Sequence, residues 1–111
     1  MPQTRGENAE TREGQPRPIM ALLDLLGRRW TLRILWELRE RPLTSRALRV
    51  ACDDISPTVL QKRLDELRAA MIVERTSDGY ALSVVGRDLF EALAPLLAFA
   101  KRWPGVPNAV S

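Results

Sequence analysis

Residues 55–71 read ISPTVLQKRLDELRAAM, and this stretch decides the fold because a clear helix start is followed by a helical apolar pattern. Ser56 can accept a hydrogen bond from an amide of the first turn, and Pro57 suits the first helical position, where no amide is needed. Apolar residues then recur at i, i+4, i+7 and i+11, which places them on one narrow stripe. They are Leu60, Leu64, Leu67 and Met71. We therefore predict a helix whose stripe faces a core.

The opposite face of this helix is polar. Thr58, Gln61 and Lys62 can donate hydrogen bonds, and Asp65 is the one anion among them. Taken alone, such a face is most simply a solvated helix surface. Its neighbours favour another interpretation, because a short helix opening at Thr44 precedes it across a tight turn, and a basic two-stranded hairpin is expected at 72–82. Helix, turn, helix and wing is the arrangement that presents its second helix to the major groove of DNA.

Length and charge are compatible with this interpretation. The chain has 111 residues, enough for one domain. Its formal net charge is +3, and seven arginines between Arg28 and Arg49 stand against two acids, Glu37 and Glu40. Such a basic stretch supports a polyanionic partner, although biased codon usage produces the same pattern.

Composition excludes several other classes of protein. Histidine is absent and Cys52 is the only cysteine, which excludes a disulfide framework, a zinc finger and a Cys/His nucleophile pair within one chain. Without a Gly-rich phosphate loop or a paired-carboxylate motif, we predict no enzyme, no metal and no cofactor. Cys52 is expected to be a small buried apolar residue, with a redox sensor as the alternative. The start lacks an apolar signal core and Asp24 interrupts the longest apolar run, so we expect a cytoplasmic protein without a membrane span.

The chain divides into one domain and two tails. Residues 1–17 lack periodic apolar residues, which predicts a disordered N-terminal tail. Residues 18–103 form the predicted winged helix-turn-helix domain, mainly α with a small β-hairpin wing, which binds DNA and dimerises. Its remaining helices are expected at 18–26, at 30–40 and after a cap at Ser83. Residues 104–111 are a C-terminal tail.

The first and last helices carry more apolar surface than one neighbour can cover. The helix at 18–26 is apolar almost all round until Gly27 ends it. A second copy of the chain is the expected cover. The predicted dimer interface comprises Ile19, Leu22, Leu23, Leu26, Phe90, Leu93, Leu97 and Trp103. Between these helices, Trp30 and Trp36 are expected to anchor the core.

Several fragments of the chain occur in a familiar order. They are residues 25–32 (LLGRRWTL), Ile55 to Pro57 with Val59 and Leu60, Arg63-Leu64 with Glu66-Leu67, residues 72–75 (IVER), and Leu82-Ser83 ahead of Gly86-Arg87. In order and spacing this set resembles the HxlR-type winged helix-turn-helix regulators of bacteria, within the broader MarR and PadR-like group. The likeness covers about residues 18–103. It implies a cytoplasmic homodimer, joined through its first and last helices, whose paired recognition helices read a pseudo-palindromic operator.

Three features depart from the family pattern. Many members have a cysteine just before the first helix, in some of them a sensor of oxidants or aldehydes; residues 15–18 here read QPRP, so the resemblance implies no such switch. The short wing tip at 77–79 should reduce reach into the minor groove. Asp65 stands where relatives often have a basic residue, and its carboxylate costs affinity unless it pairs with Arg68 or accepts from a cytosine amine.

The predicted recognition helix spans 56–70, and we assign its exposed side chains to base edges. Gln61 can pair with adenine, Lys62 with guanine, and Thr58 can touch a thymine methyl group.

A second set of side chains is assigned to phosphates, which set the register on DNA. It comprises Ser45, Arg46 and Arg49 on the outer side of the preceding helix, together with Ser56 and either Arg28 or Arg29. For Arg63 a phosphate contact and an internal pair with an acid are both open. Arg75 is either a minor-groove phosphate ligand or an exposed strand charge.

A winged-helix module that binds protein, without specific DNA binding, is the alternative function. The short wing, Asp65 and the modest net charge favour it. A small-molecule effector is not identified by the sequence. A pocket between the first helix, the Trp30 helix and the last helix would be its place, and plain core is the simpler interpretation of the apolar residues there.

Overall fold

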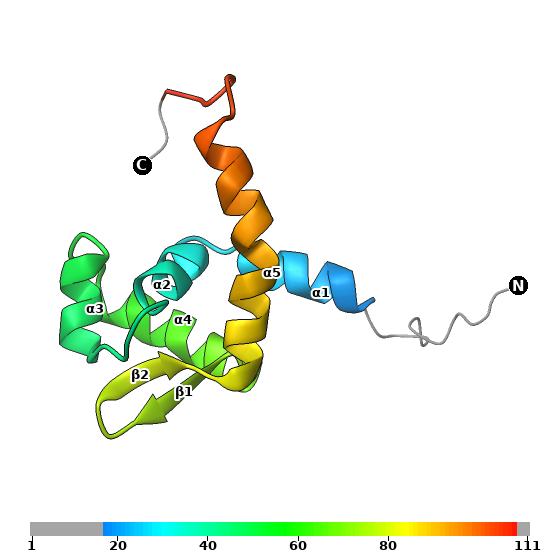
Figure 1. Ribbon diagram of the computed structural model, residues 1–111. Coiled ribbons are helices and arrows are strands. Elements are labelled where there is room, and N and C mark those ends of the chain that lie inside the picture. Colours follow the sequence, from blue (N-terminus) through cyan, green and yellow to red (C-terminus); the bar gives the residue numbers. More distant parts are fainter. Residues whose placement is uncertain (1–16, 109–111) are drawn as a thin grey trace, which may run out of the picture.

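The computed structural model describes residues 17–108, so the predicted tails lie outside the described residues except for Arg17 and 104–108. Within this range the elements follow the order α1 (Pro18–Leu26), α2 (Thr31–Glu37), α3 (Ser45–Ala51), α4 (Pro57–Ala69), β1 (Val73–Thr76), β2 (Gly79–Leu82) and α5 (Val84–Lys101). The predicted fold, mainly helical with a two-stranded antiparallel wing, is confirmed. In Figure 1 the hairpin lies at the base of the molecule, and α1 and α5 project away from α3.

Three helices begin at the predicted hydroxyl caps. The side-chain oxygens of Thr44, Ser56 and Ser83 each accept a hydrogen bond from the backbone amide three residues on, at 3.1, 3.1 and 2.9 Å. These bonds satisfy amides that have no partner inside the first turn. The starts of α3, α4 and α5 are therefore set locally.

Helix α2 is shorter than the predicted 30–40. Trp30 has a left-handed backbone, with φ of 80°, so the helix begins only at Thr31, and it ends at Glu37. The expectation that both tryptophans anchor the core is correct only in part. Trp30 is half-buried, whereas Trp36 is 38% exposed and lies between the guanidinium of Arg39, 3.8 Å from its ring centroid, and the ring of Phe90.

The prediction that Met71 belongs to the buried stripe of α4 is wrong. Leu60, Leu64 and Leu67 are buried as expected, but Met71 is 67% exposed and has a φ of 65°. The amides of Met71 and Ile72 bond back to carbonyls of the last helical turn, a left-handed termination that redirects the chain into β1. Ile72 occupies the core in place of Met71.

The wing is attached to the helices through a third extended segment. Leu43, between α2 and α3, exchanges two backbone hydrogen bonds with Tyr80 of β2, at 2.9 and 2.8 Å. Gly79 makes this approach possible: its φ is 119°, and an added Cβ would lie 2.5 Å from the Leu43 carbonyl. The hairpin is therefore fixed to the connection that leads into α3.

The terminal helices keep much of their apolar surface exposed. Ile19, Met20 and Leu23 of α1 are each more than half exposed. Of the predicted interface, Leu26 is buried in the core of its own subunit, Leu22, Phe90, Leu93 and Leu97 are half-buried, and Trp103, beyond the end of α5, is 42% exposed. No helix in the described range is long and apolar enough to cross a membrane.

Candidate nucleic-acid interface

The outer face of α4 brings the predicted base-reading residues together. Thr58, Gln61 and Lys62 are exposed and, with Asp65, line one shallow hollow of about 600 Å³. Their spacing of three and four residues places them on adjacent turns of one helix face. The buried leucines of the opposite stripe hold this face outward.

Gln61 is already engaged within this face. Its side-chain nitrogen donates to the Asp65 carboxylate at 2.9 Å. Of the partners suggested for Asp65, Arg68 is therefore not the one present in the structure. Gln61 would have to leave Asp65 before both of its amide groups could pair with an adenine.

Two arginines hold the turn between α3 and α4. Asp53 and Asp54 in this turn have φ of 58° and 60°, left-handed values that are uncommon outside glycine. Arg49 donates to the Ile55 carbonyl at 3.0 Å, and Arg33 donates to the Ala51 carbonyl at 2.6 Å. The phosphate role of Arg49 stays a prediction, and its Nε is used by a contact within the turn. Arg33 was not singled out by the sequence: its pair with Glu37 at 2.9 Å is local, but its contacts with Ala51 and Asp53 in the turn lie far along the chain.

Several predicted phosphate ligands are exposed. Ser45 and Arg46 lie at the start of α3, and Ser56 keeps a hydroxyl hydrogen to donate because its oxygen is the acceptor in the α4 cap. Arg75 is exposed on β1, with its guanidinium 5.4 Å from the centroid of the Tyr80 ring. Ser45, Arg46, Ser56 and Arg75 remain predictions as phosphate ligands.

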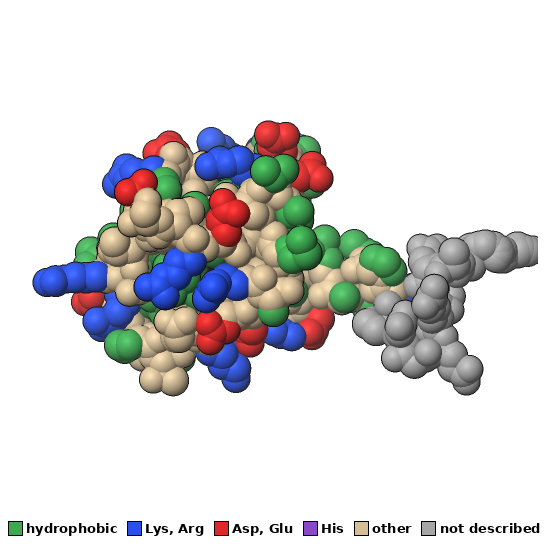
Figure 2. Space-filling view, turned by 90° about the horizontal axis from the view of Figure 1, so that it is seen from below, with side chains coloured by type: hydrophobic (Ala, Val, Ile, Leu, Met, Phe, Trp, Pro, Cys, Tyr) green, Lys and Arg blue, Asp and Glu red, His purple; other side chains and the backbone are tan. Residues whose placement is uncertain are grey.

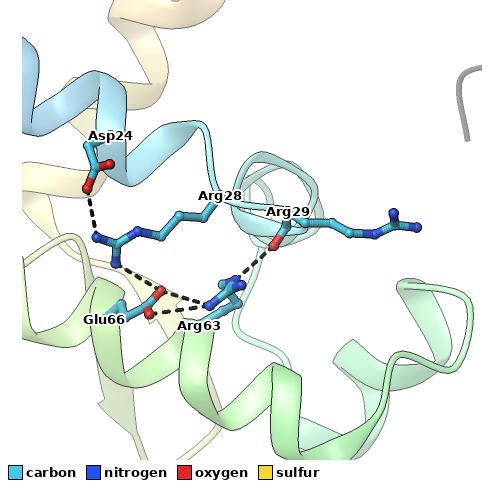
Figure 3. Close-up of polar contacts among 5 residues, drawn as sticks. All are labelled: Asp24, Arg28, Arg29, Arg63 and Glu66. Atoms are coloured by element: carbon cyan, nitrogen blue, oxygen red, sulfur yellow. Dashed lines mark hydrogen bonds and ion pairs between the residues drawn. The ribbon is translucent and has the colours of Figure 1, made fainter.

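Arg28 and Arg63 belong to a cluster of charges between the α1–α2 turn and α4 (Figure 3). Arg28 contacts Asp24 at 2.8 Å and Glu66 at 3.3 Å, and Arg63 contacts Glu66 at 3.2 Å. The hydrogen bond to Asp24, and then that to Glu66, raise the pKa of Arg28 above its ordinary value. Of the two roles left open for Arg63, the internal pair is the one present. The side chain of Arg29 points away from the cluster.

Glu66 was named in the sequence only as part of a family fragment and was given no role of its own. Its position three residues after Arg63 was the only local signal. Its contact with Arg28 spans two elements, and no sequence pattern indicates it.

The underside of the molecule, where the hairpin lies, carries Lys and Arg side chains over its centre and left side in Figure 2, with acidic side chains among them. Hydrophobic side chains gather on the right, towards α1. Basic and apolar surfaces thus occupy different ends of this face.

A groove of about 610 Å³ lies between α1 and α5. Its lining comes from α1, from the segment between α4 and β1, and from α5, and includes Leu22, Leu25, Ile72, Asp88 and Leu89. No residue of α2 lines it, so it differs in place from the effector pocket suggested by the sequence. Within residues 17–108 no three His, Cys, Asp or Glu side chains gather as a metal site would require.

Cys52 is fully buried, as expected for a small apolar role. Burial raises the pKa of its thiol, so the neutral form is favoured at physiological pH.

Comparison with solved structures places the fold among transcription regulators. The quinone-bound form of YodB from B. subtilis aligns with a TM-score of 0.71 and 29% identity over 77% of this chain and 97% of that chain. Its reduced form aligns with a TM-score of 0.71 and 26% identity over 85% of this chain and 100% of that chain. A possible HxlR family transcriptional factor from Thermoplasma volcanium GSS1 aligns with a TM-score of 0.67 and 30% identity over 77% of this chain and 83% of that chain. A comparison with curated proteins finds no match.

The family comparison agrees with these structures. The HxlR-like helix-turn-helix family matches residues 25–106, a range that includes α2 to α5 and the wing. The chain belongs to the HxlR-like helix-turn-helix family.

Proposed function

We propose that the protein is a homodimeric, sequence-specific DNA-binding transcription regulator of the cytoplasm. One observation carries the proposal: in a chain of this family, α4 exposes a compact set of hydrogen-bonding side chains on the face opposite its buried stripe. Such a helix, preceded by α3 and followed by a hairpin, has the geometry of a recognition helix.

Base recognition would involve Thr58, Gln61 and Lys62. Lys62 can contact guanine and Thr58 a thymine methyl group. The bond between Gln61 and Asp65 offers two modes of recognition. Gln61 can leave Asp65 to pair with adenine, or the pair can remain and Asp65 can use its second oxygen to accept from a cytosine amine.

Phosphate contacts would set the register of the protein on DNA. The exposure of five side chains supports this role: Ser45, Arg46, Ser56, Arg29 and Arg75. Arg28 and Arg63 would contribute only if a phosphate competes with Glu66 for their guanidinium groups.

Dimerisation would use the exposed apolar surface of α1 and α5. Ile19, Leu23 and Trp103 supply its exposed part, and the half-buried Leu22, Phe90, Leu93 and Leu97 lie beside them. A large apolar surface on projecting helices is unfavourable in water and marks a contact with another chain. A two-fold dimer would place its α4 helices about one DNA turn, or ~34 Å, apart.

Selection from a random duplex library with the purified protein tests this function. We expect enrichment of a palindrome whose half-sites lie about one helical turn apart, with affinity falling as salt is raised from roughly 50 to 200 mM. Weak binding without an enriched sequence would contradict the proposal.

That negative result would favour a protein-binding module. The acidic side chains on the α4 face, Asp65 and Glu66, are the observation that supports this second candidate. A continuous positive strip in the surface potential of the dimer would argue against it.

A further inference from the structure

We propose that Glu66 is a positioning residue: by holding Arg28 and Arg63 together it fixes α1 against α4, and thereby sets the half-site spacing that the dimer selects. This inference rests on the proposed function, in which α1 dimerises and α4 reads DNA. Glu66 itself contacts neither the partner subunit nor a base in this scheme.

The cluster makes two connections between the α1–α2 turn and the recognition helix. The first is the contact of Arg28 with Glu66, at 3.3 Å. The second is the hydrogen bond from Arg63 to the backbone carbonyl of Arg29, at 2.8 Å. Glu66 acts on both, because its two oxygens also accept from Arg63 at 3.2 and 3.3 Å and so orient that guanidinium (Figure 3).

The contacts of Glu66 are partly buried. The side chains of Glu66 and Arg63 are only 21% and 17% exposed, and that of Arg28 is 37% exposed. Half-buried charges are less screened by water and salt than exposed ones. Arg28 is further held by Asp24, four residues earlier in the same segment. That pair lies within the α1 segment, so the contacts that reach α4 are those of Arg28 with Glu66 and of Arg63 with the Arg29 carbonyl.

Half-site spacing is the property that such a connection controls. In the proposed dimer α1 forms the contact between subunits, so the angle between α1 and α4 would set the separation of the two recognition helices. One base pair changes that separation by ~3.4 Å and rotates one half-site about the DNA axis. If this angle is fixed, the dimer binds weakly to operators whose spacer is one base pair longer or shorter than the preferred one.

Glu66→Gln tests the inference, because the amide keeps the shape of the side chain and removes its charge. Asp24→Asn is the matched control: it also removes one carboxylate from Arg28, but that contact does not reach α4. Binding is measured on synthetic duplexes with identical half-sites, selected by the wild-type protein, and spacers of the preferred length or one base pair longer or shorter. For each variant, the affinity for the preferred spacer is divided by the affinity for the altered spacer. This ratio cancels any general change in affinity caused by the lost charge.

We expect the wild-type protein and Asp24→Asn to favour one spacer by roughly fivefold or more, and Glu66→Gln to reduce this ratio to about twofold or to move the optimum. An unchanged ratio in Glu66→Gln, or equal changes in both variants, would overturn the inference and leave the proposed function intact. A wild-type protein that selects no half-site and no spacer would instead overturn the proposed function. If Glu66→Gln does not fold, Arg28→Gln cuts the first of the two connections while keeping Arg63 on Glu66, and a change in spacer preference in the same direction is expected.

Discussion

At the scale of single residues, Lys62 is the most direct test of base recognition. It is exposed on α4 and, among the described residues, has no ion-pair partner. We expect Lys62→Ala to relax preference at one or two base pairs and to cost roughly 1–3 kcal/mol of specific binding. Competition between operator variants measures this. Lys101→Ala, the same change at the far end of α5, should leave preference unchanged; equal behaviour of the two variants would remove Lys62 from the recognition set.

Cys52 provides a prediction about stability and pH. Because burial raises the pKa of its thiol in the folded protein, the unfolded chain loses this proton first as pH rises. Ionisation of the thiol therefore leaves the free energy of unfolding unchanged below about pH 8. Above the unfolded pKa of about 8.5 it lowers that free energy, because the unfolded chain ionises more readily than the folded one.

We expect the wild-type protein to lose free energy of unfolding relative to Cys52→Ala above about pH 8.5, by at most about 1.4 kcal/mol per pH unit. Urea denaturation at about pH 7 and about pH 9.5 measures the difference, and the comparison with Cys52→Ala cancels the titration of other groups. Parallel pH dependence of both proteins would mean that the thiol is not desolvated.

The sequence identified which residues occupy the α4 face but not how they pair. Thr58, Gln61 and Lys62 follow from helical spacing, which is local. Gln61 has several possible partners within reach, and its hydrogen bond to Asp65 is only one of them. Arg28 and Glu66 come into contact only when the chain has folded. Side-chain pairing across elements depends on tertiary geometry, and periodicity carries no information about it.

At the scale of elements, the junction between the wing and α5 depends on Gly86. It is buried, and a Cβ at this position would overlap the Ile72 carbonyl oxygen, which also accepts hydrogen bonds from Ser83. The start of α5 therefore lies directly on the chain that enters β1, and no side chain fits between them.

We expect Gly86→Ala to destabilise the protein by about 1–3 kcal/mol or more, although alanine is normally preferred to glycine in a helix. The opposite sign is expected because backbone atoms must move to admit the methyl group. Chemical denaturation measures the change. Gly105→Ala, outside the helices, should alter stability by less than about 0.5 kcal/mol. A stabilised Gly86→Ala variant would show that α5 does not pack this closely.

Three helix starts were predictable, whereas the start of α2 and the end of α4 were not. The caps at Thr44, Ser56 and Ser83 depend on residues three apart, so the sequence contains them. Trp30 and Met71 instead have left-handed backbones where the chain changes direction, and neither residue type favours that conformation. Tertiary packing imposes these two turns. The bridge between Leu43 and Tyr80 likewise joins distant segments and has no local signal.

At the scale of the whole molecule, one subunit exposes two kinds of surface at opposite ends. Helix α3 and the wing lie on one side, and α1 with its apolar side chains projects on the other (Figures 1 and 2). In the proposed dimer this separation would let the chain contact its partner and DNA at once. The predicted two-fold arrangement depends on it, because each subunit must hold its copy of α4 away from the shared helices.

Leu23→Glu tests this arrangement. Leu23 is 55% exposed on α1, so a charge there is tolerated within the subunit but is costly in an apolar contact between subunits. We expect the variant to be monomeric by light scattering at about 10 μM and to lose about 100-fold or more in operator affinity, because the second half-site no longer binds intramolecularly. Val50→Glu changes an aliphatic residue on α3 that is 69% exposed and lies on the far side of the molecule from α1, and this variant should remain dimeric. If Leu23→Glu stayed dimeric with normal affinity, α1 would not be the dimerisation helix, and the spacing role inferred for Glu66 would lose its basis.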